Sequence, residues 1–213
     1  MNLAGLMEAF RDEASDTEQP YLWSDSEVWR YVDQAVTRFV SVTGGIRDAA
    51  SPVTDLILPA GAATVELDPC ILKLLNVMDP LRGRLNLINH TDPMAALVAS
   101  TGLVARYIVR GETEGMIRPV PVPTADQAVK LTVTRLPLKS IVDENSKLEV
   151  RPEYVPHLVY GVLARAFLKD DPETYQPARA EKNMTRFEEL CEAAKSELQM
   201  RNRAPQPIQY GGL

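Results

Sequence analysis

The chain has 213 residues, of which 45% are hydrophobic and 24% charged, as in a globular protein of one domain or one domain with a second inserted into it. Its formal net charge is −6 and no basic patch stands out, so the sequence argues against a protein that grips nucleic acid by its phosphates. Its apolar runs are far shorter than the ~20 residues of a membrane span, and its first residues do not read as a secretion signal, so we expect neither.

The excess negative charge lies near the N-terminus. Residues 1–34 hold two bases, Arg11 and Arg30, against eight acids. These acids are Glu8, Asp12, Glu13, Asp16, Glu18, Asp25, Glu27 and Asp33. The remainder of the chain is close to neutral, so any function of the charge is expected in this segment.

Two helices are predicted first. Leu3, Leu6, Met7 and Phe10 recur at helical spacing and indicate a short amphipathic helix, which gives way to a polar loop over 15–20. Ser24 and Glu27 then form the pattern of a capping box, and a second helix is expected to run to about residue 43, where two glycines end it.

The apolar period changes to two over residues 53–138, which predicts a β-rich segment. Residues 56–58 and 64–68 read as strand, turn and strand, and 105–110 and 116–120 as a hairpin around 111–115. Three prolines, Pro119, Pro121 and Pro123, should keep the second hairpin strand at an edge. Residues 71–78 form another apolar segment, further strands are expected at 84–88 and 128–136, and residues 92–101 read as a helix or an irregular arm. In the strand at 128–136, the same side should carry Val129, Leu131, Val133 and Arg135.

Two more helices follow. One is expected after Pro152, which suits a first helical turn, with Gly161 marking close packing, and a long one over about 175–201. The tail, residues 204–213, holds two prolines and two glycines and is predicted to be an extended arm. Such an arm is either disordered or docked on a partner, and its candidate contact residues are Pro205, Pro207, Ile208, Tyr210 and Leu213.

Together these elements predict an α+β fold. We expect a four-helix bundle made of residues 1–50 and 150–203, because neither amphipathic helix pair can bury its apolar face alone. The β-rich domain at 53–138 is then an insertion into that bundle, and 204–213 extends from it. The β-rich domain has few residues to cover both faces of its strands, so we expect it to complete its packing against a neighbouring subunit.

No catalytic, cofactor or metal site is predicted. His90 lies in a turn, His157 beside an apolar stripe, and no nucleophile elbow or phosphate-binding loop is present. Adjacent acid pairs such as those at 170–171 and 188–189 do not face each other on a helix. Cys70 and Cys191 are interpreted as buried, reduced thiols, since no Cys/His cluster has zinc-site spacing.

Several sequence motifs follow one another in a recognisable order. They are YLWSDSEVWRYVDQA at 21–35, LILPAG at 56–61 with VELD at 65–68, LTVTRLPL at 131–138, and PEYVPHLVYGVLARA at 152–166, followed by the stretch from 171 to 187. In this order they resemble phage head-to-tail adaptor proteins. In that family, the segment that corresponds to residues 56–68 is a hairpin. The match covers most of residues 1–200, is weakest over 81–122, and does not include the tail after 203.

The resemblance implies a four-helix bundle bearing a β domain and a ring of subunits, usually twelve, between the portal and the tail nozzle or tail tube. It implies no enzyme activity and no cofactor, a place in the virion neck after assembly in the host cytoplasm, and an arm at 204–213 lying on the portal protein. Double-stranded DNA would pass through such a ring without specific binding. Acids around its channel would repel the phosphates, and the candidates are Glu8, Asp12, Glu13 and Asp16.

The residues alone leave two other functions open. One is a cell-wall hydrolase carried in the virion, and the other is a binding module unrelated to virions. Release of peptidoglycan fragments would identify the first, and a metabolic rather than a viral gene neighbourhood would identify the second.

Overall fold

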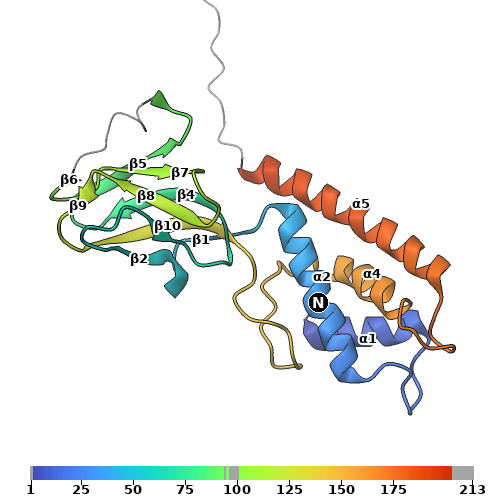
Figure 1. Cartoon of the computed structure of the whole chain (residues 1–213). Helices are drawn as coiled ribbons and strands as arrows, with labels where there is room; N and C mark the ends of the chain where they lie inside the picture. The colour runs from blue at the N-terminus through green and yellow to red at the C-terminus, as the bar shows by residue number, and fades with distance from the viewer. Residues whose placement is uncertain (1, 94, 96–100, 203–213) are drawn as a thin grey trace, which may run out of the picture. The chain divides into compact units, whose positions relative to one another are not determined.

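The computed structural model describes residues 2–93, 95 and 101–202, and it divides into two compact units (Figure 1). The helical unit comprises residues 1–44 and 139–213, and the sheet unit comprises residues 45–138. The fold is therefore α+β. The predicted helix or arm at 92–101 lies largely outside the described residues, and the predicted extended tail at 204–213 lies outside them entirely.

Four helices are described in the helical unit. They are α1 (Leu3–Ala14), α2 (Asp25–Thr43), α4 (Val155–Ala166) and α5 (Pro177–Asn202). α4 packs against all three others, and α2 also packs against α5. The central position of α4 explains its composition, since eight of its twelve residues are buried. The four-helix bundle expected from the sequence stays a prediction about how these helices are arranged.

The caps of the first two helices follow directly from the sequence. The Asn2 side chain accepts a hydrogen bond from the Gly5 amide at 3.0 Å and begins α1. Ser24 and Glu27 form the predicted capping box at the start of α2. Gly44 ends α2 in the left-handed region at φ 93°, where a side chain would be strained.

Gly161 lies at the closest approach of three helices. A Cβ atom there would come within 3.1 Å of both the Ala35 Cβ and the Phe187 ring, so the predicted close packing is confirmed. The prediction for Pro152 was wrong. The helix begins at Val155 and Pro156 occupies its first turn, because the backbone before it forms a separate turn closed by the Tyr154 amide on the Arg151 carbonyl.

The sheet unit ends at residue 138, where the β-rich domain was expected to end, but it begins at residue 45 instead of 53, and the helical unit resumes at residue 139 instead of 150. Residues 46–48, which were expected to belong to the helical bundle, form a strand of the sheet. Residues 139–149 belong with the helices. The buried Ile141 illustrates this, because its amide donates to the Asp33 carboxylate of α2 at 2.8 Å.

The described residues of the sheet unit form an eight-stranded sheet and a two-stranded one. The large sheet has the order β1-β10-β4-β5-β7-β8-β3. A further strand, β2, also pairs with β10: β1 pairs with residues 133–135 of β10, and β2 pairs with residues 127–130. All its pairs are antiparallel except β5 with β7. Its strands are β1 (Ile46–Asp48), β2 (Asp55–Leu58), β3 (Val65–Glu66), β4 (Ile71–Asp79), β5 (Gly83–Asn89), β7 (Tyr107–Arg110), β8 (Met116–Val120) and β10 (Gln127–Arg135). The small sheet pairs β6 (Thr101–Gly102) with β9 (Val122–Pro123), and a 3-10 turn, η1 (Pro52–Thr54), precedes β2.

The predicted hairpin of β7 and β8 is confirmed. The hairpin expected from 56–58 and 65–68 is wrong, because β2 pairs with β10 whereas β3 pairs with β8 at the other end of the sheet. The expected edge position of the proline-rich strand also needs correction. β8 has β7 on one side and, over Met116 and Ile117, the short β3 on the other.

The core of the sheet unit follows the predicted alternation. On β10, Val129, Leu131, Val133 and Arg135 are buried on one side. The three apolar residues of this row join Leu58, Val77, Ile108 and Ile117 in one apolar cluster. Arg135 is buried at the end of this row because it forms an ion pair with Asp48 of β1, whose side chain is also buried.

Candidate interaction surfaces of the helical unit

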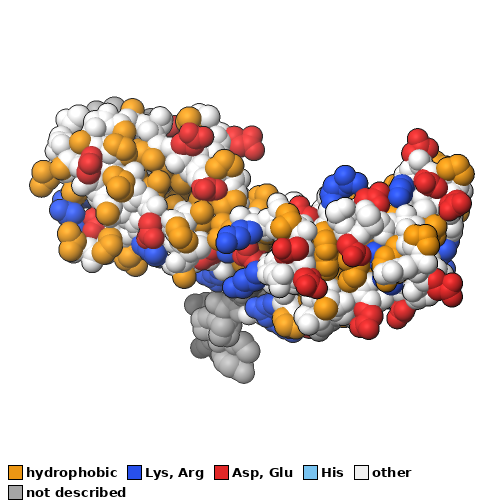
Figure 2. All heavy atoms as spheres, turned by 90° about the horizontal axis from the view of Figure 1, so that it is seen from below, with side chains coloured by type: hydrophobic (Ala, Val, Ile, Leu, Met, Phe, Trp, Pro, Cys, Tyr) orange, Lys and Arg blue, Asp and Glu red, His pale blue; other side chains and the backbone are white. Residues whose placement is uncertain are grey.

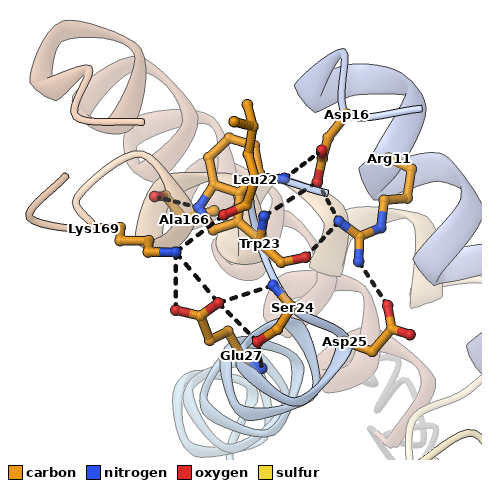
Figure 3. A network of polar contacts seen from close by, with 9 residues as sticks. All are labelled: Arg11, Asp16, Leu22, Trp23, Ser24, Asp25, Glu27, Ala166 and Lys169. Carbon is orange, nitrogen blue, oxygen red and sulfur yellow. Dashed lines mark hydrogen bonds and ion pairs between the residues drawn. The ribbon is translucent and has the colours of Figure 1, made fainter. Parts of the chain in front are cut away.

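The loop between α1 and α2, residues 15–24, is held by a buried ion pair (Figure 3). The Arg11 guanidinium donates to the Asp16 carboxylate, to the Trp23 carbonyl at 2.7 Å and to the Asp25 carboxylate at 2.6 Å. Asp16 also accepts from the Leu22 amide at 2.8 Å. Because Asp16 is only 3% exposed and bound by Arg11, it cannot be one of the surface acids expected around a channel.

The loop is also fastened to the end of α4. The Trp23 indole N–H donates to the Ala166 carbonyl at 3.0 Å, and the indole packs edge-on against Phe10 and Phe167. Trp23 is 1% exposed, so it joins α1 and the α4 terminus in one core. This contact spans 143 positions in the sequence, which is why residue spacing did not indicate it.

The capping box of α2 extends into the same network. Lys169 approaches Glu27 at 3.2 Å and donates to the Leu22 carbonyl at 3.0 Å. Burial favours a higher pKa for Glu27, but hydrogen bonds from Ser24 and the charge of Lys169 outweigh it and lower the pKa. The start of α2 is thereby anchored to the segment that follows α4, as Figure 3 shows.

A groove of about 920 Å³ opens beside this network, and we call it the acidic groove. Its apolar part comes from Ala4, Met7, Tyr21 and Trp29. Its acids are Glu8, Asp12, Asp25, Asp143 and Glu144, and its polar residues are Thr17, Gln19 and Asn145. The base in its lining is Arg11, whose charge is already matched by Asp16 and Asp25.

Two of the predicted channel acids line the acidic groove. Glu8 and Asp12 are exposed and line it, whereas Glu13 is exposed but is not among the lining residues. The acids at 143 and 144 were missed from the sequence because they lie in a loop more than a hundred residues away.

Figure 2 shows acidic side chains distributed over the surface of the helical unit. The sheet unit holds nine acids and nine bases, so the net charge of −6 belongs to the helical unit.

The sheet unit has a smaller hollow of about 420 Å³. It lies between β4 and the ends of β5 and β7, and its lining includes Lys73, His90 and Arg110. Arg110 donates to the Leu74 carbonyl at 2.9 Å and to the Asn89 side chain at 3.0 Å, so its guanidinium serves the sheet itself.

The surroundings of the two cysteines and of His157 are typical of structural residues and not of a catalytic nucleophile or base. Burial raises the pKa of the Cys70 thiol to about 11, helped by Asp68, and that of Cys191 to about 12. Burial and the nearby Arg186 lower the pKa of His157. Cys191 is buried as predicted, whereas Cys70 is only half-buried, which corrects that prediction. Thiols with such raised pKa values are poor nucleophiles near neutral pH.

Within residues 2–93, 95 and 101–202, no cluster of His, Cys, Asp and Glu is placed to hold a metal ion. Over the same residues, no helix is long and apolar enough to cross a membrane.

The comparisons with known proteins decide the family. The family model described as SU10 adaptor protein matches residues 1–209. The chain belongs to the SU10 adaptor family. This is a family of phage head-to-tail adaptors, which confirms the resemblance seen in the sequence. No curated protein matches the chain.

Membership of the SU10 adaptor family makes the chain a structural adaptor of a phage, with a place in the virion neck and general contact with portal and tail proteins. A structural adaptor family also implies a protein that is not an enzyme. The functional residues of such a chain are those that touch other proteins. The acidic groove, a hollow that combines apolar and acidic side chains, is a candidate for such a contact.

Proposed function

We propose that copies of this chain form a ring, twelve in number as the family resemblance implies, that joins the portal to the tail nozzle or tail tube and surrounds the path of the DNA. The observation that carries this proposal is the family match over residues 1–209. The concentration of the net negative charge in the helical unit supports it, since like charge keeps phosphates from binding to a channel wall.

The distribution of exposed acids refines the channel proposal. Glu8 and Asp12 line the acidic groove, so we assign them to a protein contact. Glu13 is exposed outside that lining and is our candidate for the channel wall. Reversing its charge with Glu13→Lys should slow DNA ejection from assembled particles, because each subunit would then offer the phosphates a cation. An unchanged ejection rate would remove Glu13 from the channel.

The arm at 204–213 is proposed to dock on the portal through Pro205, Pro207, Ile208, Tyr210 and Leu213. This follows from its composition and from the family resemblance. A chain that ends at residue 203 should fold as the full chain does, because the two units have their own cores, and it should no longer bind portal.

Negative-stain microscopy of the full chain mixed with purified portal tests the proposal directly. A ring at the distal end of the portal is the expected result, and absence of bound adaptor would contradict the proposed function. Circular dichroism of the shortened chain is the control for folding. Portal binding by the shortened chain would contradict the role of the arm and leave the ring proposal intact.

A further inference from the structure

A pair of exposed leucines stands at one end of the sheet unit. Leu81, in the turn between β4 and β5, is 87% exposed, and Leu103, before β7, is 71% exposed. β5 and β7 are parallel neighbours that both begin at this end, so the two leucines lie on adjacent connections. Single exposed leucines are common on protein surfaces, so exposure alone carries no conclusion.

A buried polar clamp holds both connections in place. The Asp79 carboxylate, 2% exposed, accepts from the Leu81 amide at 2.8 Å and the Arg82 amide at 3.1 Å. The buried Gln127 side chain donates to Asp79 at 2.9 Å and exchanges hydrogen bonds with the Ala105 backbone, accepting at 2.7 Å and donating at 3.2 Å. The backbone at Leu81 and the backbone two residues after Leu103 are therefore held by hydrogen bonds before any partner arrives, which lowers the entropy lost on binding.

Three arginines lie within three residues of the two leucines along the chain. Arg82 pairs with Asp79, which is itself buried. Arg84, at the start of β5, and Arg106, just before β7, are exposed and have no ion-pair partner among the residues that the structure describes. An acid at the same end, Asp126, accepts from the Ala60 amide at 2.9 Å. We call the surface formed by Leu81, Leu103, Arg82, Arg84 and Arg106 the leucine tip.

The acidic groove has the complementary properties. It combines apolar side chains with four exposed acids, Glu8, Asp12, Asp143 and Glu144, that have no ion-pair partner in the described part of the chain. Its volume of about 920 Å³ is large enough to receive a side-chain-bearing turn. An apolar hollow with an acidic rim fits an apolar protrusion with a basic rim.

We propose that the leucine tip of one copy docks in the acidic groove of a neighbouring copy. The two surfaces are different parts of the chain, so the contact is heterologous, and each copy keeps one free tip and one free groove for the next copy. Contacts of this type generate closed rings when the rotation between copies closes. The inference rests on the proposed function, because it names the contact that would build the proposed ring.

Crosslinking between copies tests the contact. One protein carries Leu81→Cys and a second carries Thr17→Cys in the groove, both with Cys70→Ser so that the remaining native thiol is the buried Cys191. They are mixed with portal and treated with a short thiol-to-thiol crosslinker. In the matched control, the second protein carries Thr185→Cys in place of Thr17→Cys; Thr185 is also an exposed threonine, but it lies on α5 outside the groove lining.

The expected result is a Leu81→Cys and Thr17→Cys dimer in a yield on the order of tenfold above the control, since docked thiols share a high effective concentration. Equal yields from the two pairs would overturn the inference. Co-sedimentation with portal is measured in the same samples. Portal binding without the specific crosslink overturns the contact alone, and the crosslink without portal binding supports the contact while removing the proposed function.

A charge exchange provides a second measurement. Arg84→Glu with Arg106→Glu makes the tip acidic, and replacing all four unpaired acids of the groove, Glu8, Asp12, Asp143 and Glu144, with lysine makes the groove basic. Each variant alone should fail to form rings on portal, and an equal mixture should recover them, because each reversed tip then meets a reversed groove and each native tip a native groove. Rings formed by either variant alone, or none in the mixture, would contradict the docking of tip in groove.

Discussion

The buried pair of Arg11 and Asp16 leads to a sharp prediction about stability. Replacing Arg11 with methionine keeps much of the side-chain volume but removes all three hydrogen bonds of the guanidinium. The Asp16 carboxylate, with a side-chain exposure of 2%, would then keep only backbone amide donors. Leaving such a charge uncompensated costs about 3–5 kcal/mol.

The cost of Arg11→Met can be divided between its two acidic partners by changing Asp25 and Asp16 separately. The Asp25 side chain is 67% exposed, so losing its ion pair should cost less than about 1 kcal/mol in the control variant Asp25→Asn. Adding Asp16→Asn to Arg11→Met removes the orphaned charge. The double variant should therefore be more stable than the sum of the single changes predicts, by about 1–3 kcal/mol for groups in direct contact.

Urea unfolding followed by tryptophan fluorescence is the appropriate assay. Both tryptophans of the chain, Trp23 and Trp29, are buried in the helical unit, so the signal reports the unit that contains the pair. A loss below about 1 kcal/mol for Arg11→Met, or strict additivity in the double variant, would refute the idea that Arg11 stabilises a buried charge.

Three further predictions concern single residues. Gly161→Val should destabilise the helical unit by about 1–3 kcal/mol, because its side chain would overlap the Phe187 ring, and the same fluorescence assay would measure it. Asp48 has a pKa below its ordinary value because hydrogen bonds from Ser51, Ala50 and Arg135 outweigh the effect of burial. The ionised carboxylate therefore stabilises the sheet unit above the pKa that Asp48 has in the unfolded chain, and this stabilisation is lost as the pH falls toward the pKa of the folded protein. Asp48→Asn should reduce the loss of sheet stability at acid pH, measured by circular dichroism. Cys70 should react with iodoacetamide at pH 8 about a hundredfold more slowly than a thiol of pKa 9.0, and Asp68→Asn should speed the reaction; equal rates would show that Asp68 has no influence on the thiol.

The local elements of this adaptor could be predicted because their causes are local. The capping box at Ser24 and Glu27 needs only residues three apart, and the buried row on β10 needs only a period of two. Gly161 was recognised as a packing site because a glycine inside a helix has a cost that close packing explains. The family, too, could be read from the order of such local motifs.

The sites could not be predicted because each is made from distant segments. The acidic groove joins α1 to a loop at 143–145, and the clamp at the leucine tip joins Asp79 and Ala105 through Gln127. The pairing of β2 and β3 with strands other than each other also depends on long-range packing.

Sequence alone thus determined the helices, most strands, the α+β class and the family, because periodicity and capping depend on near neighbours. Only the tertiary structure decided which acids are available. Asp16 and Glu8 look alike in the sequence, yet one is buried against Arg11 and the other is exposed in a groove. The physical reason is that the free energy of a charge depends on its burial and its partners, and both are set by residues far along the chain.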